Sequence, residues 1–186
     1  RVFEAWKESG NVLELARNPK VLRVLKTLYG RQAIPFQTIN FKKGTNQPLH
    51  SDAIHFHTIP HRWMVGTWTA LQDMTQFNGT LQIVPGSHKW PVYEFPDLNL
   101  EVPQNRGDQF DQYKQYEQFL IDLVTQHEVH TREALIKKGS TLIWAANLLH
   151  GGSKTIDTNS TRWSQATHYY FEGCDNYYFL LFSNWY

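Results

Sequence analysis

The sequence predicts a mainly β protein, folded as a barrel or jelly roll, with helices at its start and one helical insert. Short segments of alternating, β-branched and aromatic residues recur at near-regular spacing, and turn-forming pairs separate them. Aromatic residues make up 15% of the 186 residues, which favours a β-rich core or an aromatic-lined pocket over a helical bundle. Because no repeat, low-complexity tract or linker divides the chain, we expect one domain over residues 1–186.

Two short helices are expected within residues 1–30, where they would support the β core. The second helix begins at Asn18-Pro19, a capping residue followed by proline at the first helical position, and Gly30 ends it. Its apolar residues recur at helical spacing, which predicts one buried face made of Val21, Leu22, Leu25 and Leu28.

The β core is expected over residues 33–186, because β-forming residues and turn pairs replace the helical pattern. The predicted strands cover residues 33–41, 65–74, 81–84, 128–136, 140–146, 162–171 and 179–186. An insert at about 90–127 starts with a segment rich in Pro, Asn, Asp and Gln and continues as a helix. Asp108 is predicted to cap that helix and His127 to end it.

The composition argues against several classes of partner. The formal charge is +1 and both signs are scattered along the chain, so no basic stripe predicts nucleic-acid binding. No apolar run approaches the roughly eighteen residues of a membrane-spanning helix. The single cysteine, Cys174, forbids an internal disulfide, is expected to be structural, and suits a reducing, cytoplasmic location. The chain begins with Arg1 and ends in an apolar segment, so we expect both ends to be cut.

Two short motifs a hundred positions apart contain candidate metal ligands: His50-Ser-Asp52 and His150-Gly-Gly. Residues two apart on an extended segment point to the same side, so His50 and Asp52 could chelate one ion. Two histidines and one carboxylate hold Fe(II) on one face and leave the opposite positions open. The composition alone gives about 0.8 His-x-Asp/Glu pairs by chance, so the single pair present needs support from its surroundings.

That support comes from an ordered series of four segments: LHSDAIHF, GTLQIVPGSHKW, KKGSTLIWAANLLHGGS and NSTRWSQATHYY. In this series the chain resembles the phytanoyl-CoA dioxygenase-like family of Fe(II)/2-oxoglutarate oxygenases over residues 50–170. The resemblance implies a double-stranded β-helix, a cupin-like jelly roll. It also implies that His50, Asp52 and His150 are the iron ligands, with 2-oxoglutarate and dioxygen as co-substrates.

The resemblance assigns co-substrate contacts to four further residues. Arg162 matches the arginine that binds the far carboxylate of 2-oxoglutarate, a task suited to a planar, permanently charged fork. Ser153 matches a hydroxyl contact to the same carboxylate, although one extra glycine follows the distal histidine. Trp68 and Gln47 fall where the family often contacts the co-substrate. The alternatives are a surface Arg162 paired with Asp157, and a Trp68 that belongs only to the core.

Other aromatic residues and histidines follow the metal pair closely. His55, Phe56, His57, His61 and Trp63 are candidates for the wall of a substrate pocket. His88 is expected to be structural, and His168 alternates in phase with Arg162, which would place it on the inward face.

The predicted function is hydroxylation of an unactivated carbon in a small-molecule substrate, with release of succinate and carbon dioxide. Halogenating relatives have a small residue at the position of Asp52, so chlorination is not expected. Two alternatives stay open. One is a non-catalytic ligand-binding module with a vestigial site, and the other is a cupin-like metalloenzyme that does not use 2-oxoglutarate and would give Arg162 no task. The substrate and the oligomeric state do not follow from the sequence.

Overall fold

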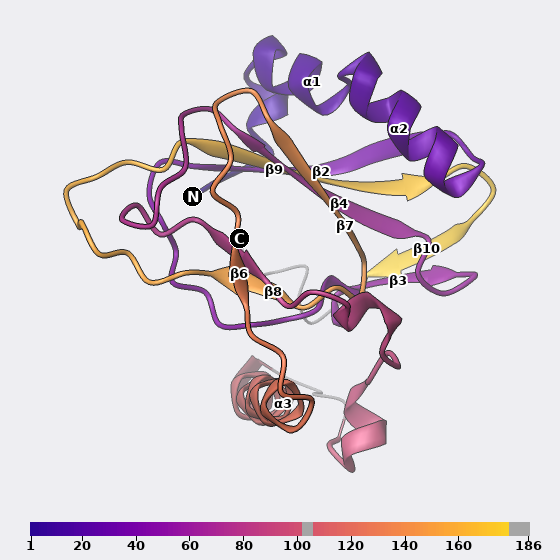
Figure 1. The fold of residues 1–186 in the computed structure, drawn as a ribbon. Helices are drawn as coiled ribbons and strands as arrows, with labels where there is room; N and C mark the ends of the chain where they lie inside the picture. The colour runs from indigo at the N-terminus through magenta and orange to yellow at the C-terminus, as the bar shows by residue number, and fades with distance from the viewer. Residues whose placement is uncertain (102–105, 179–186) are drawn as a thin grey trace.

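The computed structural model has two antiparallel β layers that face each other, and it describes residues 1–101 and 106–178 (Figure 1). The larger sheet has the strand order β1-β2-β9-β4-β7, and the opposite layer consists of the sheet β6-β5-β8 and the pair β10-β3. The strands are β1 Val2–Phe3, β2 Ala33–Phe41, β3 Phe56–Ile59, β4 Met64–Ala70, β5 Leu81–Ile83, β6 Arg132–Glu133, β7 Thr141–Ala145, β8 His150–Gly152, β9 Ser164–Phe171 and β10 Asp175–Tyr178. This arrangement is the jelly roll that the spacing of strands and turns predicts.

Six of the seven predicted strands correspond to β2, β4, β5, β6, β7 and β9, although several ends differ. The sequence did not predict β1, β3, β8 and β10. The strand predicted over residues 128–136 is reduced to β6, because the following N–H groups bond within their own segment. Leu135 N–H donates to the carbonyl of Glu133, and Ile136 N–H donates to that of Ala134, so neither joins a ladder. The strand predicted to reach residue 74 ends at Ala70. The strand predicted over residues 179–186 lies outside the described residues.

The N-terminal helices cover the outer face of the larger sheet (Figure 1). They are the 3-10 helix η1 Ala5–Lys7, α1 Gly10–Ala16 and α2 Pro19–Tyr29. As predicted, the Asn18 side chain accepts a hydrogen bond from Lys20 N–H at 2.9 Å, and Gly30 ends α2 with φ 70°. Leu25 is fully buried, whereas Leu28 is 64% exposed, so its predicted place on the buried face was wrong. The buried face of α2 is narrower than the apolar spacing predicts.

The inserted helix, α3 Arg106–Gln126, lies beside the smaller layer, on the opposite side of the molecule from α1 and α2 (Figure 1). The helix begins two residues before Asp108, so Asp108 is inside it and the predicted cap was wrong. Gly107, predicted to belong to the preceding loop, is helical, which shows that local helix propensity did not decide where the helix starts. At the other end Glu128 has φ 53°, and the chain turns away there.

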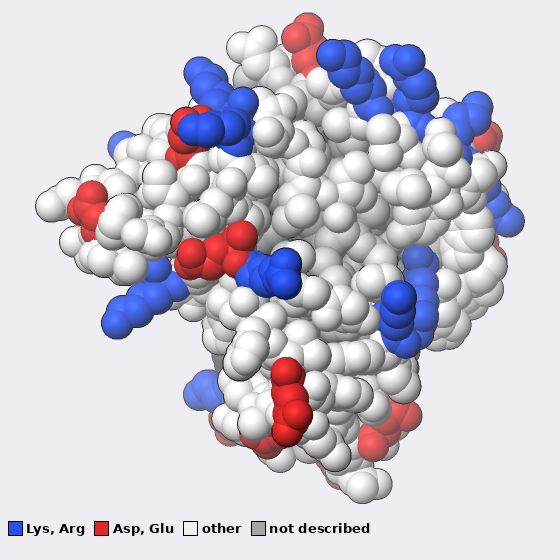
Figure 2. All heavy atoms as spheres, viewed as in Figure 1, with Lys and Arg blue, Asp and Glu red and all other residues white. Residues whose placement is uncertain are grey.

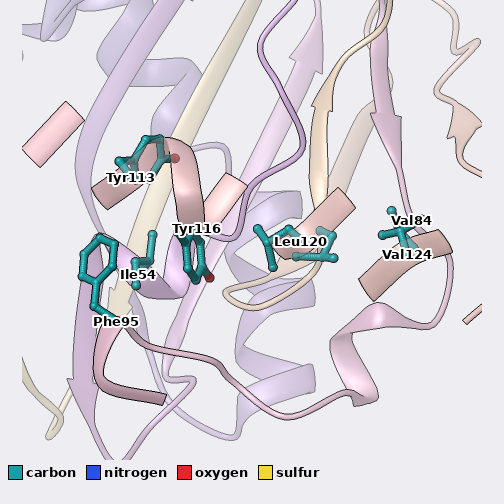
Figure 3. Packing of buried hydrophobic residues seen from close by; sticks show 8 residues of the cluster. Ile54, Val84, Phe95, Tyr113, Tyr116, Leu120 and Val124 are labelled. Carbon is teal, nitrogen blue, oxygen red and sulfur yellow. The ribbon is translucent and has the colours of Figure 1, made fainter. Parts of the chain in front are cut away.

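α3 packs on the two segments that contain the candidate metal ligands. Figure 3 shows apolar side chains of α3 against Ile54, Val84 and Phe95. The buried cluster consists of Ile54, Val84, Phe95, Tyr113, Tyr116, Leu120, Val124 and Leu149. Ile54 belongs to the 3-10 helix η2 Asp52–Ile54, and Leu149 directly precedes β8. Burial of each large apolar side chain stabilises the fold by about 1.5 to 3 kcal/mol, so this cluster fixes both segments against one helix.

The molecular surface carries charges of both signs. On the face seen in Figure 2, Lys and Arg are interspersed with Asp and Glu, and wide uncharged areas separate them. The remaining short helices, η3 Ser87–Lys89 and η4 Phe95–Leu98, lie in the connection before α3. Among the helices of residues 1–101 and 106–178, none has both the length and the apolar character needed to cross a bilayer.

Candidate metal and co-substrate site

A two-residue β-bridge brings the distant ligand segments together. His50 N–H donates to the His150 carbonyl at 2.9 Å, and His150 N–H donates to the His50 carbonyl at 3.0 Å. Residues 50–52 do not form the strand assumed for them, because Asp52 already begins η2. The intervening Ser51 is nevertheless extended, with φ −113° and ψ 136°, and its hydroxyl accepts a bond from Ala53 N–H. The extended conformation of one residue is therefore enough to put His50 and Asp52 on the same side.

His50, Asp52 and His150 are buried, and each offers one ligand atom within 4.8 Å of the other two. The Nε2 atoms of His50 and His150 lie 3.9 and 3.8 Å from the two carboxylate oxygens of Asp52. Each Nδ1 atom lies 2.9 Å from a backbone carbonyl, that of Pro48 or Leu148. A carbonyl only accepts, so Nδ1 carries the hydrogen and the lone pair of Nε2 points toward the carboxylate.

The protonation states suit a divalent cation. Burial, strengthened by the nearby His150, lowers the pKa of His50 to about 3. Burial alone would raise the pKa of Asp52, but the neighbouring histidines His150, His168 and His50 lower it to about 2. At neutral pH His50 is therefore a neutral imidazole and Asp52 an anion, which are the deprotonated forms that metal binding requires.

The two glycines after His150 are required by a close approach of backbone. A Cβ atom on Gly151 would lie 2.8 Å from the carbonyl oxygen of Gln47 and 2.9 Å from that of Pro48. A Cβ atom on Gly152 would lie 3.0 Å from Gln47 N. The crowding expected at these glycines therefore comes from the chain just before His50. Because glycine has no Cβ atom, this chain can lie directly against the segment that follows His150.

A cavity of about 600 Å³ contains all three ligand residues. Residues of β2, β4, β7 and β9 line it from the larger sheet, and residues of β5 and β8 line it from the opposite layer. The cavity therefore lies between the two layers of the jelly roll, where electrostatic interactions are stronger than in bulk water.

Arg162 lies in this cavity and is 2% exposed. Its guanidinium carbon is 5.1 Å from the ring centre of Phe41 and 5.3 Å from that of Trp68. Nη2 donates to the Lys43 carbonyl at 3.3 Å, whereas Nε has no hydrogen-bond partner. Burial, together with the charge of Arg1, lowers the pKa of Arg162 to about 10, which leaves the group protonated at neutral pH.

No carboxylate of the described part of the chain forms an ion pair with Arg162, so the alternative of a surface pair with Asp157 was wrong. A buried, unpaired cation is costly unless an anion joins it. The cavity therefore contains a preformed binding position for an anionic group.

The other predicted co-substrate residues lie in different settings. Trp68 lines the cavity, and its buried indole Nε1 has no partner. Gln47 also lines it, with Nε2 3.2 Å from His50 Nε2 and Oε1 accepting from Arg1. Ser153 is buried with an unpartnered hydroxyl but does not line the cavity, which agrees with the shift that the extra glycine introduces.

Two of the five predicted pocket-wall residues face the cavity. His55 and Phe56 line it, whereas His57, Trp63 and the exposed His61 do not. Successive side chains of a strand point to opposite sides, so β3 directs Phe56 inward and His57 outward, where its Nδ1 lies 3.6 Å from Glu94 Oε1. Trp63 packs in the apolar cluster beneath α2 instead.

Trp144, His168, Gln37 and Tyr113 also line the cavity, although the sequence assigned them no role there. Trp144 Nε1–H donates to Asp52 Oδ2 at 2.7 Å. His168 faces inward, as its phase with Arg162 predicts; its Nε2 is 3.7 Å from Asp52 Oδ2 and its Nδ1 is 2.7 Å from Gln37 Oε1. Tyr113 of α3 reaches in from the insert, and its hydroxyl is 3.2 Å from His55 Nε2. Strand alternation could have suggested Trp144 and Gln37, but no local pattern connects Tyr113 with the site.

Comparisons with known proteins establish the family and the fold of the chain. The family model described as phytanoyl-CoA dioxygenase matches residues 3–164. The chain belongs to this family. The peroxisomal phytanoyl-CoA dioxygenase of Rattus norvegicus is a similar family member, 24% identical over 179 residues that cover 92% of this chain and 49% of the relative. The chain therefore spans about half the length of this curated relative.

Two solved structures show the same fold. The EctD structure from S. alaskensis, solved with 2-oxoglutarate and 5-hydroxyectoine, has a TM-score of 0.68 and 22% identity, and the match covers 91% of this chain and 55% of that one. The SnoN structure, a non-heme alpha ketoglutarate dependent epimerase from nogalamycin biosynthesis, has a TM-score of 0.68 and 20% identity, with coverages of 93% and 63%. These likenesses confirm the predicted double-stranded β-helix.

Proposed function

We propose that this member of the phytanoyl-CoA dioxygenase family is an Fe(II)/2-oxoglutarate-dependent oxygenase that hydroxylates an unactivated carbon of a small molecule. One observation carries the proposal. One cavity holds a buried three-residue metal-ligand set and a separate, buried arginine without an ion-pair partner. The first group suits a divalent cation and the second suits an anion, and 2-oxoglutarate has a chelating end and a distant carboxylate.

The ligand set fits Fe(II). His50, Asp52 and His150 supply two imidazole nitrogens and one carboxylate, the donor set of non-heme iron oxygenases that keep coordination positions open. The backbone carbonyls of Pro48 and Leu148 fix both rings, so the ligand atoms are oriented before any ion binds.

The opposite group of donors fits the far carboxylate of 2-oxoglutarate. Arg162 stays charged at neutral pH and has an unpaired Nε, and Trp68 contributes an unpaired indole N–H in the same cavity. A charge-assisted bond to a buried guanidinium is about twice as strong as a neutral one. Arg162 and Trp68 would therefore bind and orient the co-substrate, and the buried walls would exclude water.

When bound, Fe(II) supplies the redox chemistry by which dioxygen converts 2-oxoglutarate to succinate and carbon dioxide and one oxygen atom reaches the substrate. Asp52 would favour hydroxylation over chlorination, because its carboxylate would occupy the ligand position that halogenating relatives leave open. His55 and Phe56 would line the substrate side of the cavity.

The two alternatives explain less of the cavity. A non-catalytic module would have no use for three preoriented ligand groups. A cupin-like metalloenzyme without 2-oxoglutarate would leave the unpaired cation of Arg162 without a task.

The test is anaerobic reconstitution with Fe(II) and 2-oxoglutarate, followed by exposure to labelled dioxygen in chloride buffer with a panel of small molecules. We expect succinate to form, and the product of an accepted substrate to gain labelled oxygen. Absence of succinate with every member of the panel would favour the binding module. Oxidised product without succinate would favour the metalloenzyme that does not use 2-oxoglutarate, and chlorinated product without labelled oxygen would contradict the role of Asp52.

A further inference from the structure

Trp144, on β7, is the only residue of the described chain for which a hydrogen bond to the Asp52 carboxylate is found. We propose that Trp144 is a positioning residue that holds Asp52 as a one-oxygen ligand. The inference rests on the proposed metal site, and it concerns how the carboxylate is presented rather than what the bound ion does.

The geometry of this bond is specific. The indole N–H donates to Oδ2 at 2.7 Å, a short distance for a bond between N–H and oxygen. His150 Nε2 and His168 Nε2 are 3.8 and 3.7 Å from the same oxygen, beyond hydrogen-bond distance. Oδ1 is left facing His50 Nε2 at 3.9 Å. The bond thus distinguishes the two carboxylate oxygens.

Packing against Gly66 and His150 fixes the position of the Trp144 indole. Trp144 pairs with Gly66 across β7 and β4, and a Cβ atom on Gly66 would lie 2.2 Å from the indole ring. The ring also contacts His150, with ring centres 4.8 Å apart. Trp144 is 4% exposed, so the indole has little freedom to move. Because Gly66 has no side chain, the indole of Trp144 can lie over this position and reach Asp52.

The consequence concerns the number of free coordination positions. A carboxylate that binds an octahedral ion through both oxygens occupies two of six positions, and with two imidazoles it would leave two. A chelating co-substrate and dioxygen together need three. An indole N–H that is bonded to Oδ2 leaves only Oδ1 to bind the ion. The carboxylate would then take one coordination position, and three positions would stay free for the co-substrate and dioxygen.

The decisive experiment replaces Trp144 with 3-benzothienylalanine, in which sulfur takes the place of the indole N–H and the ring shape is kept. Co(II) is the probe, measured by titration and by its visible d–d spectrum. Loss of a hydrogen bond to a metal ligand typically weakens metal affinity by about 10 to 100-fold, so we expect that loss together with a changed spectrum. Trp63→Phe, which alters an indole in the cluster beneath α2, is the matched control and should leave both measurements unchanged.

Either measurement left unchanged by the isostere would overturn the assignment, because a merely structural role would lower stability without altering the Co(II) spectrum. A second measurement needs no variant. In the unmutated protein saturated with Zn(II), the indole N–H of Trp144 should keep a downfield, slowly exchanging NMR signal, and rapid exchange would contradict the proposal. Neither measurement requires turnover, so the role of Trp144 is tested independently of the oxygenase activity.

Discussion

The cavity has two polar ends that are built in opposite ways. At the metal end, formed by His50, Asp52 and His150, the atoms that face away from the ion already have protein partners. At the arginine end, formed by Arg162 and Trp68, donor atoms are buried without partners. The metal end is therefore oriented in advance, whereas the arginine end lacks an anion to complete it.

The difference has a thermodynamic cause. A histidine with one nitrogen bonded to a carbonyl and the other directed into the cavity is satisfied even without a metal. A buried guanidinium with an unpaired N–H is destabilising until a counter-ion binds. The unpaired guanidinium therefore lowers the stability of the folded protein, and binding of the co-substrate carboxylate would remove this destabilisation.

The largest effect is expected from His150→Ala, which removes one of three ligands at the metal end. The weak visible charge-transfer band expected on anaerobic addition of Fe(II) and 2-oxoglutarate should disappear, because two remaining ligands do not hold the ion. His130→Ala, at an exposed histidine, is the matched control and should retain the band. Persistence of the band in His150→Ala would mean that the third ligand is misassigned.

Arg162→Met tests the arginine end and should affect the two ends differently. Loss of one partner of a buried charge pair costs about 2 to 5 kcal/mol, so affinity for 2-oxoglutarate should fall about 30-fold to several-thousand-fold. Metal affinity should stay nearly unchanged. In the protein free of metal and co-substrate, urea unfolding should show a gain of about 1 kcal/mol or more, because an unpaired buried charge has been removed.

Arg132→Met, at an exposed arginine of β6, is the control for Arg162→Met and should change neither co-substrate affinity nor stability appreciably. Unchanged 2-oxoglutarate affinity in Arg162→Met would falsify the role of the arginine end. A loss of stability in that variant would show that Arg162 is satisfied within the protein.

Acidification should have a smaller effect, through the cavity histidine His55 and not through the arginine end. Burial lowers the pKa of His55 to about 4, below its ordinary value of 6.5, so the unfolded chain takes up a proton at a higher pH than the folded protein does. Stability is therefore lost as pH falls below about 6.5. For His55 the loss between pH 7 and pH 5 is on the order of 2 kcal/mol. Arg162 stays protonated throughout this range and contributes nothing.

The measurement is urea unfolding of the metal-free protein at pH 7 and pH 5. His55→Gln should lose less stability over this interval than the unmutated protein, by on the order of 2 kcal/mol. His130→Ala again serves as the exposed control. Equal losses in His55→Gln and the unmutated protein would indicate that burial does not hold the His55 imidazole neutral.

The sequence by itself predicted the fold class and the pair His50 and Asp52 as candidate ligands, because each has a local signature. Strand alternation and turn pairs identified the β core, and His50-Ser-Asp52 put two candidate ligands on one side of a single extended residue. The family resemblance carried by the order of four motifs then assigned His150 and Arg162 as their partners in the proposed site.

Tertiary structure alone decided which neighbouring side chains reach the cavity. Alternation along a strand defines two faces, but only the packing of the sheets decides which face is inside, and so Phe56 lines the cavity while His57 and Trp63 do not. Contacts between distant segments depend in the same way on sheet register and on the docking of α3. The bond from Trp144 to Asp52 and the approach of Tyr113 to His55 join residues 92 and 58 positions apart, and no local pattern specifies such contacts.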